Sequence, residues 1–257
     1  METVALHRHV DDVVKQYDAL VSADAAEKQK VEGNIVFPGM EALLKVYTKC
    51  LNPKNTIMDT ERILDDAGIP ILTPEQINLF LQEAINYDSG TEESRQKVEV
   101  LDWLIERSYK KGHNNFVLNA RASCTPFSLC SIMKASKKRP LEIKVEGSVG
   151  RHCGTASEYV HISATSIGEQ CAWRAKNSII SASSMGLRCA EEGYRLVITA
   201  GSIGAECGKD AKECVFRTHR QKTLEKMMRS VARGRKNRIY LVHSDVSEEE
   251  IPEEKWR

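Results

Sequence analysis

The sequence predicts an α+β fold, in which a helical N-terminal domain is followed by a stack of short parallel strands and a C-terminal α/β cap. Three observations predict it. Apolar residues keep a helical spacing up to residue 112, and a Ser-x-Gly-x-x-Cys motif recurs every 18 residues between positions 148 and 207. One more helical pattern and one more strand pattern follow the last copy of the motif.

The composition is that of an ordinary globular protein. The 257 residues are 41% apolar and 28% charged, and the net charge of +1 gives no overall field that would attract nucleic acid or membrane. Charges occupy the N-terminus where a signal peptide needs an apolar core, so we expect a cytoplasmic protein with no membrane partner. In that compartment the eight cysteines are expected to be reduced.

Residues 1–112 are predicted to form a helical domain of four or five helices. Apolar residues at helical spacing over 10–21 and 40–51 indicate the first two. Thr73 followed by Pro74 is typical of an N-cap and first helical position. A last helix is expected to open after position 91 and to end at Gly112, a natural C-cap.

A connection is expected over residues 113–140, with a short strand at 115–119. Cys124 and Cys130 lie within it and do not have a standard metal-ligand spacing. With His113 nearby they form a weak candidate metal site. Packing of these cysteines in a core or loop is the preferred interpretation.

From residue 141 to 219 the chain is predicted to form about four coils of a β-solenoid. Eighteen residues are too few for a helical hairpin but suit one coil, with equivalent positions about 4.8 Å apart in neighbouring coils. Small residues and cysteines would fill the interior, since a free cysteine packs as a small hydrophobe. The motif columns are Ser148, Ser166, Ser184 and Ser202; Gly150, Gly168, Gly186 and Gly204; and Cys153, Cys171, Cys189 and Cys207.

The first and last copies also carry a longer glycine motif. Residues 147–154 and 201–208 both read G-x-x-G-x-x-x-G, with glycine at Gly147, Gly150, Gly154, Gly201, Gly204 and Gly208. This resembles the GxxGxxxG β-helix family, which includes the C-terminal domain of the large chain of glutamate synthase and a component of formylmethanofuran dehydrogenase. The resemblance implies a right-handed parallel β-helix with a spacer role and no catalytic residues. The middle copies depart from it, with Thr165 and Ala172, then Ser183 and Ala190, at the outer glycine positions.

The predicted cap covers residues 220–244 and consists of a helix over 221–233 and a strand over 238–243. A cap is expected because the end of a stack of strands exposes unpaired backbone. Residues 245–257 are predicted to be a flexible acidic tail.

A basic segment over residues 217–238 is the candidate for anion or nucleic-acid contacts. It has nine basic side chains and one acidic one, but no interleaved aromatics for base stacking. A solvated face, or pairing with the acidic tail, is the preferred interpretation. The candidate contacts are Arg217, Arg220, Lys226, Arg229, Arg233, Arg235 and Lys236.

The cysteine column and His161 complete the set of candidate sites. A strict one-per-coil cysteine is what core packing produces, so a metal or redox role is less favoured. His161 stands in a column otherwise filled by Ile179, Val197 and Val215, which indicates a partly buried histidine.

The function predicted from the sequence is a non-catalytic scaffold that holds protein partners or self-associates, with no cofactor and no assigned catalytic residue. The repeat is regular, and no set of catalytic side chains converges on one motif. Two alternatives remain: an accessory subunit of a metalloenzyme complex, and a nucleic-acid-binding protein that uses the basic segment.

Overall fold

The computed structural model describes the chain except residues 1–36, 53, 87–93, 121–128 and 257. The chain divides into two compact units, Met1–Pro38 and Gly39–Arg257, and the description below concerns the second. The helix predicted over residues 10–21 lies outside the described residues.

Five helices are present in the described part of the chain. The helices predicted after residue 40 and at Pro74 are confirmed, and the Thr73 cap closes through reciprocal bonds with Gln76. One helix was not predicted, although Thr56 and Asp59 form a capping box at its start. The helices are α2 (Met40–Cys50), α3 (Ile57–Asp66), α4 (Pro74–Asn86), α5 (Ser94–Lys111) and α6 (Gln221–Ser230).

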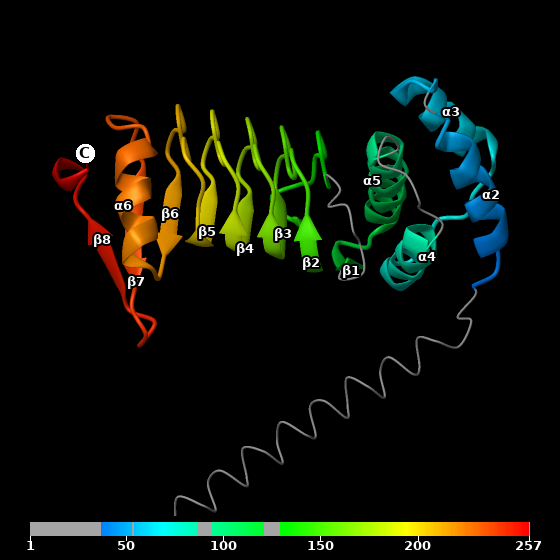
Figure 1. Ribbon diagram of the computed structural model, residues 1–257. Coiled ribbons are helices and arrows are strands. Elements are labelled where there is room, and N and C mark those ends of the chain that lie inside the picture. The colour runs from blue at the N-terminus through cyan, green and yellow to red at the C-terminus, as the bar shows by residue number, and fades with distance from the viewer. Residues whose placement is uncertain (1–36, 53, 87–93, 121–128, 257) are drawn as a thin grey trace, which may run out of the picture. The chain divides into compact units, whose positions relative to one another are not determined.

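The strands form one eight-stranded sheet in simple sequence order (Figure 1). Neighbouring strands are parallel up to β7, and only β7 and β8 are antiparallel. Helix α4 packs against β1, and α6 packs against β5, β6 and β7. The strands are β1 (Asn115–Ala120), β2 (Leu141–Val149), β3 (Val160–Ile167), β4 (Ile179–Met185), β5 (Val197–Ser202), β6 (Val215–Thr218), β7 (Arg238–Val242) and β8 (Glu248–Ile251).

The predicted fold class, a helical domain followed by a right-handed β-helix, is wrong. The chain has a mixed α/β fold in which β1, expected in a connection, and β7 and β8, expected in a cap and a tail, belong to the same sheet as the repeat. The repeat could not indicate these strands, because their residues do not pair at the 18-residue interval. Asn115 pairs with Glu142, and Val215 pairs with Arg238. The predicted flexible tail is also wrong, since it supplies β8 and a 3-10 helix at Glu253–Lys255.

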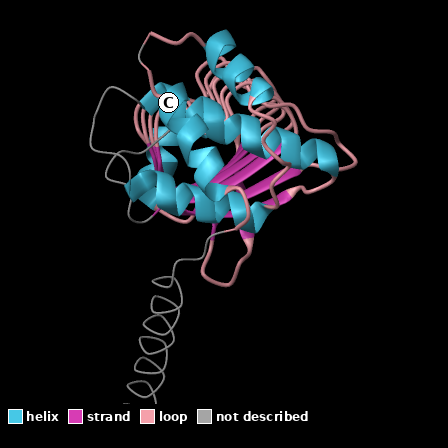
Figure 2. Ribbon diagram, turned by 90° about the vertical axis from the view of Figure 1, so that its right-hand side faces the viewer, coloured by secondary structure: helices cyan, strands magenta, loops and turns pink. Residues whose placement is uncertain are grey.

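Within the sheet, the 18-residue interval is the strand register. Ile162 lies beside Ile180, and Ile180 lies beside Ile198, so each motif column becomes a column of stacked side chains. Turns return the chain from one strand to the next, and isolated parallel bridges join these return segments at Glu158, Lys176, Tyr194 and Lys212. Figure 2, viewed from the helical end, shows the strands one behind another. We call residues 148–219 the repeat stack.

The glycines of the repeat have two physical causes. A Cβ on Gly168, Gly186 or Gly204 would lie 2.6 or 2.7 Å from backbone of the preceding repeat, so this column allows two backbones to approach closely. Gly208 instead adopts a left-handed φ of 68°, and a Cβ there would also meet the ring of Phe216. Gly147 and Gly154 have positive φ as well, whereas Gly150 begins the close-approach column and a Cβ on Gly201 would meet the Ser183 carbonyl.

Candidate interaction surface

The cysteine column is part of the core. Cys153, Cys171, Cys189 and Cys207 are fully buried free thiols, and the sulfurs of Cys189 and Cys207 lie 2.9 Å apart. Burial raises the pKa of Cys153 well above its usual value, so this thiol stays protonated. All four side chains lie in the core, where they pack as small apolar residues do.

The weak candidate metal site is not assembled by the described residues. Cys130 is buried while His113 is exposed, and Cys124 lies outside the described residues. In the part of the chain that the structure describes, no three His, Cys, Asp or Glu side chains are grouped to hold a metal ion.

Cys130 instead lies in the first return segment, which connects β1 to β2 and is capped by a side chain of α5. The carboxylate of Asp102, on α5, accepts hydrogen bonds from the backbone N–H groups of Cys130 and Ser131 at 2.7 and 3.1 Å. In the repeat stack, the equivalent N–H groups of Ala172 and Ala190 donate to carbonyls of the preceding repeat. Asp102 therefore replaces a missing neighbour, and burial raises its pKa to about 7.

Asn237 closes the other end of the return segments in the same way. Its Oδ1 accepts from the Cys214 N–H at 2.9 Å, and its Nδ2 donates to the carbonyls of Ala211 and Ala232. Earlier in the stack, the Val160 N–H donates to the Ser178 hydroxyl in the same column. Asn237 is buried, and its bonds to Cys214 and Ala211 satisfy backbone groups that water does not reach.

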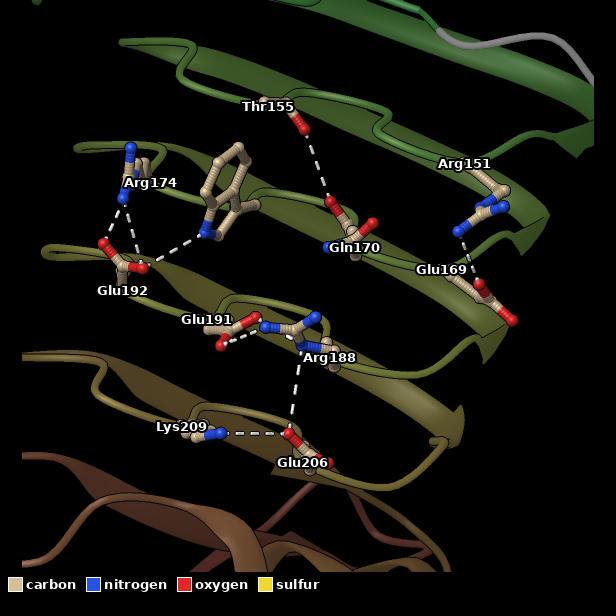
Figure 3. A network of polar contacts seen from close by, with 11 residues as sticks. Arg151, Thr155, Glu169, Gln170, Arg174, Arg188, Glu191, Glu192, Glu206 and Lys209 are labelled. Carbon is tan, nitrogen blue, oxygen red and sulfur yellow. Dashed lines mark hydrogen bonds and ion pairs between the residues drawn. The ribbon is translucent and has the colours of Figure 1, made fainter.

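Arg–Glu pairs tie successive return segments together on the outside (Figure 3). Figure 3 shows Arg151 with Glu169, Arg174 with Glu192 and Arg188 with Glu206. Arg195 pairs with Glu213 in the same way, and the partners of each pair are 18 residues apart. Since opposite charges face each other only in this register, a shift of the chain would lose the pairs. The pairs thus specify the stacking, although each one adds little stability at an exposed site.

Most of these charged residues occupy left-handed backbone positions. Arg174 and Glu192 have φ of 55° and 54°, and Arg195 and Glu213 have φ of 52° and 56°. This conformation costs a non-glycine residue roughly 1–2 kcal/mol. At most of these positions the N–H donates to a carbonyl of the next repeat, as the Arg174 N–H does to the Glu191 carbonyl.

His161 lies on β3 in register with Ile179, as its column predicted. It is half-buried, and partial desolvation lowers the pKa of its imidazole. The negative charge of the neighbouring Glu142 acts to raise the same pKa, but its effect is smaller than that of desolvation. The position indicates packing on the sheet rather than ligation.

The basic segment is dispersed over different partners. Arg217 pairs with Glu248 at 2.8 Å, Arg235 pairs with Asp210 at 3.3 Å, and Lys226 donates to the Ile203 carbonyl. The remaining candidate contacts are exposed: Arg220, Arg229, Arg233 and Lys236. The pairing of Arg217 with β8 is the neutralisation by the acidic tail that the sequence favoured.

An open groove lies between α6 and the last two strands. It has a volume of about 450 Å³ and is lined by Leu224, Met228, Leu241 and Ile251. Its remaining lining residues are polar or charged: Gln221, Glu225, Arg229, Glu249 and Lys255. No pattern in the sequence indicates this groove, because three of its lining residues, Glu249, Ile251 and Lys255, come from the segment that was expected to be a flexible tail.

No family model, curated protein or solved structure matches this chain. The resemblance of its glycine motif to the GxxGxxxG family therefore stays a prediction that no comparison tests. Among the described helices, none has the length and apolar character that crossing a membrane requires.

Proposed function

We propose that this protein is a non-catalytic scaffold that holds partner proteins in an assembly. The observation that carries the proposal is the register of the repeat stack. Backbone ladders, matched side-chain columns and Arg–Glu pairs all repeat at the same 18-residue interval. A sheet built this way has a defined length, roughly 30 Å for eight strands, and gives attached chains a rigid reference.

A cytoplasmic location belongs to the same proposal. The seven described cysteines are free thiols, as expected for a reducing compartment. A metalloenzyme accessory role and nucleic-acid binding remain alternative predictions.

The test is native mass spectrometry of the tagged full chain after mild cross-linking. We expect a complex with a fixed ratio of partner to scaffold. Gly186→Val should abolish it, because a side chain there meets backbone of the preceding repeat at 2.6 Å. Met58→Ala, which is 81% exposed on α3, is the control and should retain the complex. A chain that stays alone and monomeric, or a turnover activity lost through one substitution in a folded variant, would overturn the proposal.

A further inference from the structure

The outer edge of β8 presents backbone hydrogen-bonding groups to solvent. Beside the turn, His243 donates its N–H to the Ser247 carbonyl and accepts from the Val246 N–H, so the backbone groups of His243 point toward the returning strand. In an antiparallel ladder hydrogen-bonded pairs alternate with non-hydrogen-bonded ones, so the next hydrogen-bonded pairs are Leu241 with Glu249 and Ile239 with Ile251. The backbone groups of Glu248 and Glu250 must therefore point away from β7, along the free edge.

The two faces of β8 differ in chemistry. On the outer face, Glu248 pairs with Arg217 and Glu250 accepts from the Tyr240 hydroxyl at 2.8 Å. On the opposite face, Glu249 and Ile251 line the groove beside α6. A strand added to β8 would place alternate side chains next to carboxylates and next to the apolar wall of the groove.

A second copy of this chain is a poor occupant of the edge. Antiparallel pairing of two β8 strands, both reading Glu-Glu-Glu-Ile, would place carboxylates opposite carboxylates. Charged edges of this kind discourage self-association. Arg217 already pairs with Glu248, whereas the exposed carboxylate of Glu250 is bonded to the neutral Tyr240 hydroxyl, and its charge favours a partner strand with basic side chains on this face.

We propose that β8 is a strand-addition site for an extended peptide of a partner protein whose side chains alternate between basic and apolar. The basic side chains lie beside Glu248 and Glu250, and the apolar ones lie over the groove lined by Leu224, Met228 and Ile251. Backbone bonds give such a complex its affinity, and the alternating side chains give its specificity. The inference rests on the scaffold function and names the class of partner.

The test uses fluorescence anisotropy of labelled peptides with the full chain. The probe is a blocked peptide of alternating valine and lysine, and the controls are the same composition without alternation and an alternating valine–glutamate peptide. We expect only the probe to bind, with protection of the Glu248 and Glu250 amides from hydrogen exchange. Binding of either control peptide with equal affinity, or no protection of these amides, would overturn the inference.

Two variants of one residue isolate the backbone contribution. Glu250→Pro removes an outward N–H that β7 does not use, whereas Glu250→Ala keeps it, and both lose the bond to Tyr240. We expect affinity to fall at least tenfold with proline and only a few-fold with alanine. Exchange protection of the Leu241 amide verifies that β7 and β8 stay paired. Equal affinities of the two variants at intact pairing would overturn the site.

Sedimentation of the unliganded chain separates the remaining outcomes. A dimer that Glu250→Pro dissociates would show that a second copy occupies the edge, and would overturn the peptide proposal. If the fixed-ratio complex persists and is insensitive to Glu250→Pro, the scaffold function stands and only the β8 site fails. If no complex forms and the probe does not bind, both proposals fail.

Discussion

At the β1 end of the sheet, the outward backbone groups of Asn119 are bonded to two amide side chains of α4, those of Asn78 and Gln82. At the β8 end, the outward groups of Glu248 and Glu250 have no such partner among the described residues. At Asn119 the β1 edge is thus covered by neutral amides that match the backbone, whereas the β8 edge carries acidic side chains. Backbone groups that are already bonded cannot accept a further strand, whereas charged side chains on an edge disfavour strands of like charge.

The return segments show a different relation between the ends. Asp102 closes the first segment and Asn237 closes the last, each by replacing a missing repeat. The return side of the stack is therefore capped at both ends, and only the strand side remains open at one end. The open strand side at β8 is where we propose that a partner strand docks.

Removing the Asn237 cap should have the largest effect. Asn237→Leu leaves the Cys214 N–H and the Ala211 carbonyl buried without this partner, and also removes the bond to the half-buried Ala232 carbonyl. At about 1–3 kcal/mol for each of the two buried groups, we expect a loss of at least about 2 kcal/mol in the free energy of unfolding. Denaturant titration measures it. A loss below 1 kcal/mol would show that the cap is dispensable and that this end of the stack is open as well.

The Asp102 cap should make stability depend on pH. Its pKa is raised to about 7 in the folded chain from an ordinary value of 3.8, so the folded state binds the proton more tightly than the unfolded state. Stability from this group is present at low pH and falls as pH rises from about 4 to 7, by up to about 1.4 kcal/mol per unit.

Asp102→Asn should remove this slope, and Asp65→Asn on the exposed surface of α3 should leave it unchanged. Unfolding titrations at several pH values between 4 and 8 measure both variants. The charges of Glu99 and Glu106 act on Asp102, and burial keeps the pKa of the neighbouring Cys130 thiol well above this range. A slope that persists in Asp102→Asn would show that Asp102 is not its source.

Opening the covered β1 edge should have a moderate effect. Replacing both Asn78 and Gln82 with alanine returns the Asn119 backbone groups to solvent, and we expect a loss of about 1 kcal/mol per bond. The Asn119 amide should then exchange as fast as the Glu250 amide of the unliganded chain. Glu83→Ala on the same helix is the control. Unchanged protection of Asn119 would mean that the helix covers this edge without these two bonds.

Reversing one Arg–Glu pair should have the smallest effect. Arg174→Glu places a carboxylate beside Glu192 and should lower the melting temperature slightly, and the double exchange with Glu192→Arg should restore it. The difference in melting temperature between Arg174→Glu and the unmodified chain should vanish in about 1 M salt, where charges are screened within roughly 3 Å. If the double exchange does not restore the melting temperature, these pairs do not specify the register.

The sequence predicted local elements well wherever a short-range pattern carried them. The spacing of apolar residues and the Thr73 cap located α2 and α4, and the period of 18 gave the strand register of β3, β4 and β5. These features depend on residues near in sequence or on a repeated column, and both are visible in a single chain.

The sequence by itself thus determined the repeat, its buried cysteine column and its small-residue positions, because steric fit between identical layers acts on every copy. Only the tertiary structure decided the extent of the sheet and the state of its two edges. Membership of β1, β7 and β8 depends on single contacts without periodicity, such as Arg217 with Glu248 and Asn119 with Asn78. From the sequence alone, a segment of acidic residues is predicted to be a solvated tail. It forms a strand here because the folded chain places a basic residue, Arg217, beside it.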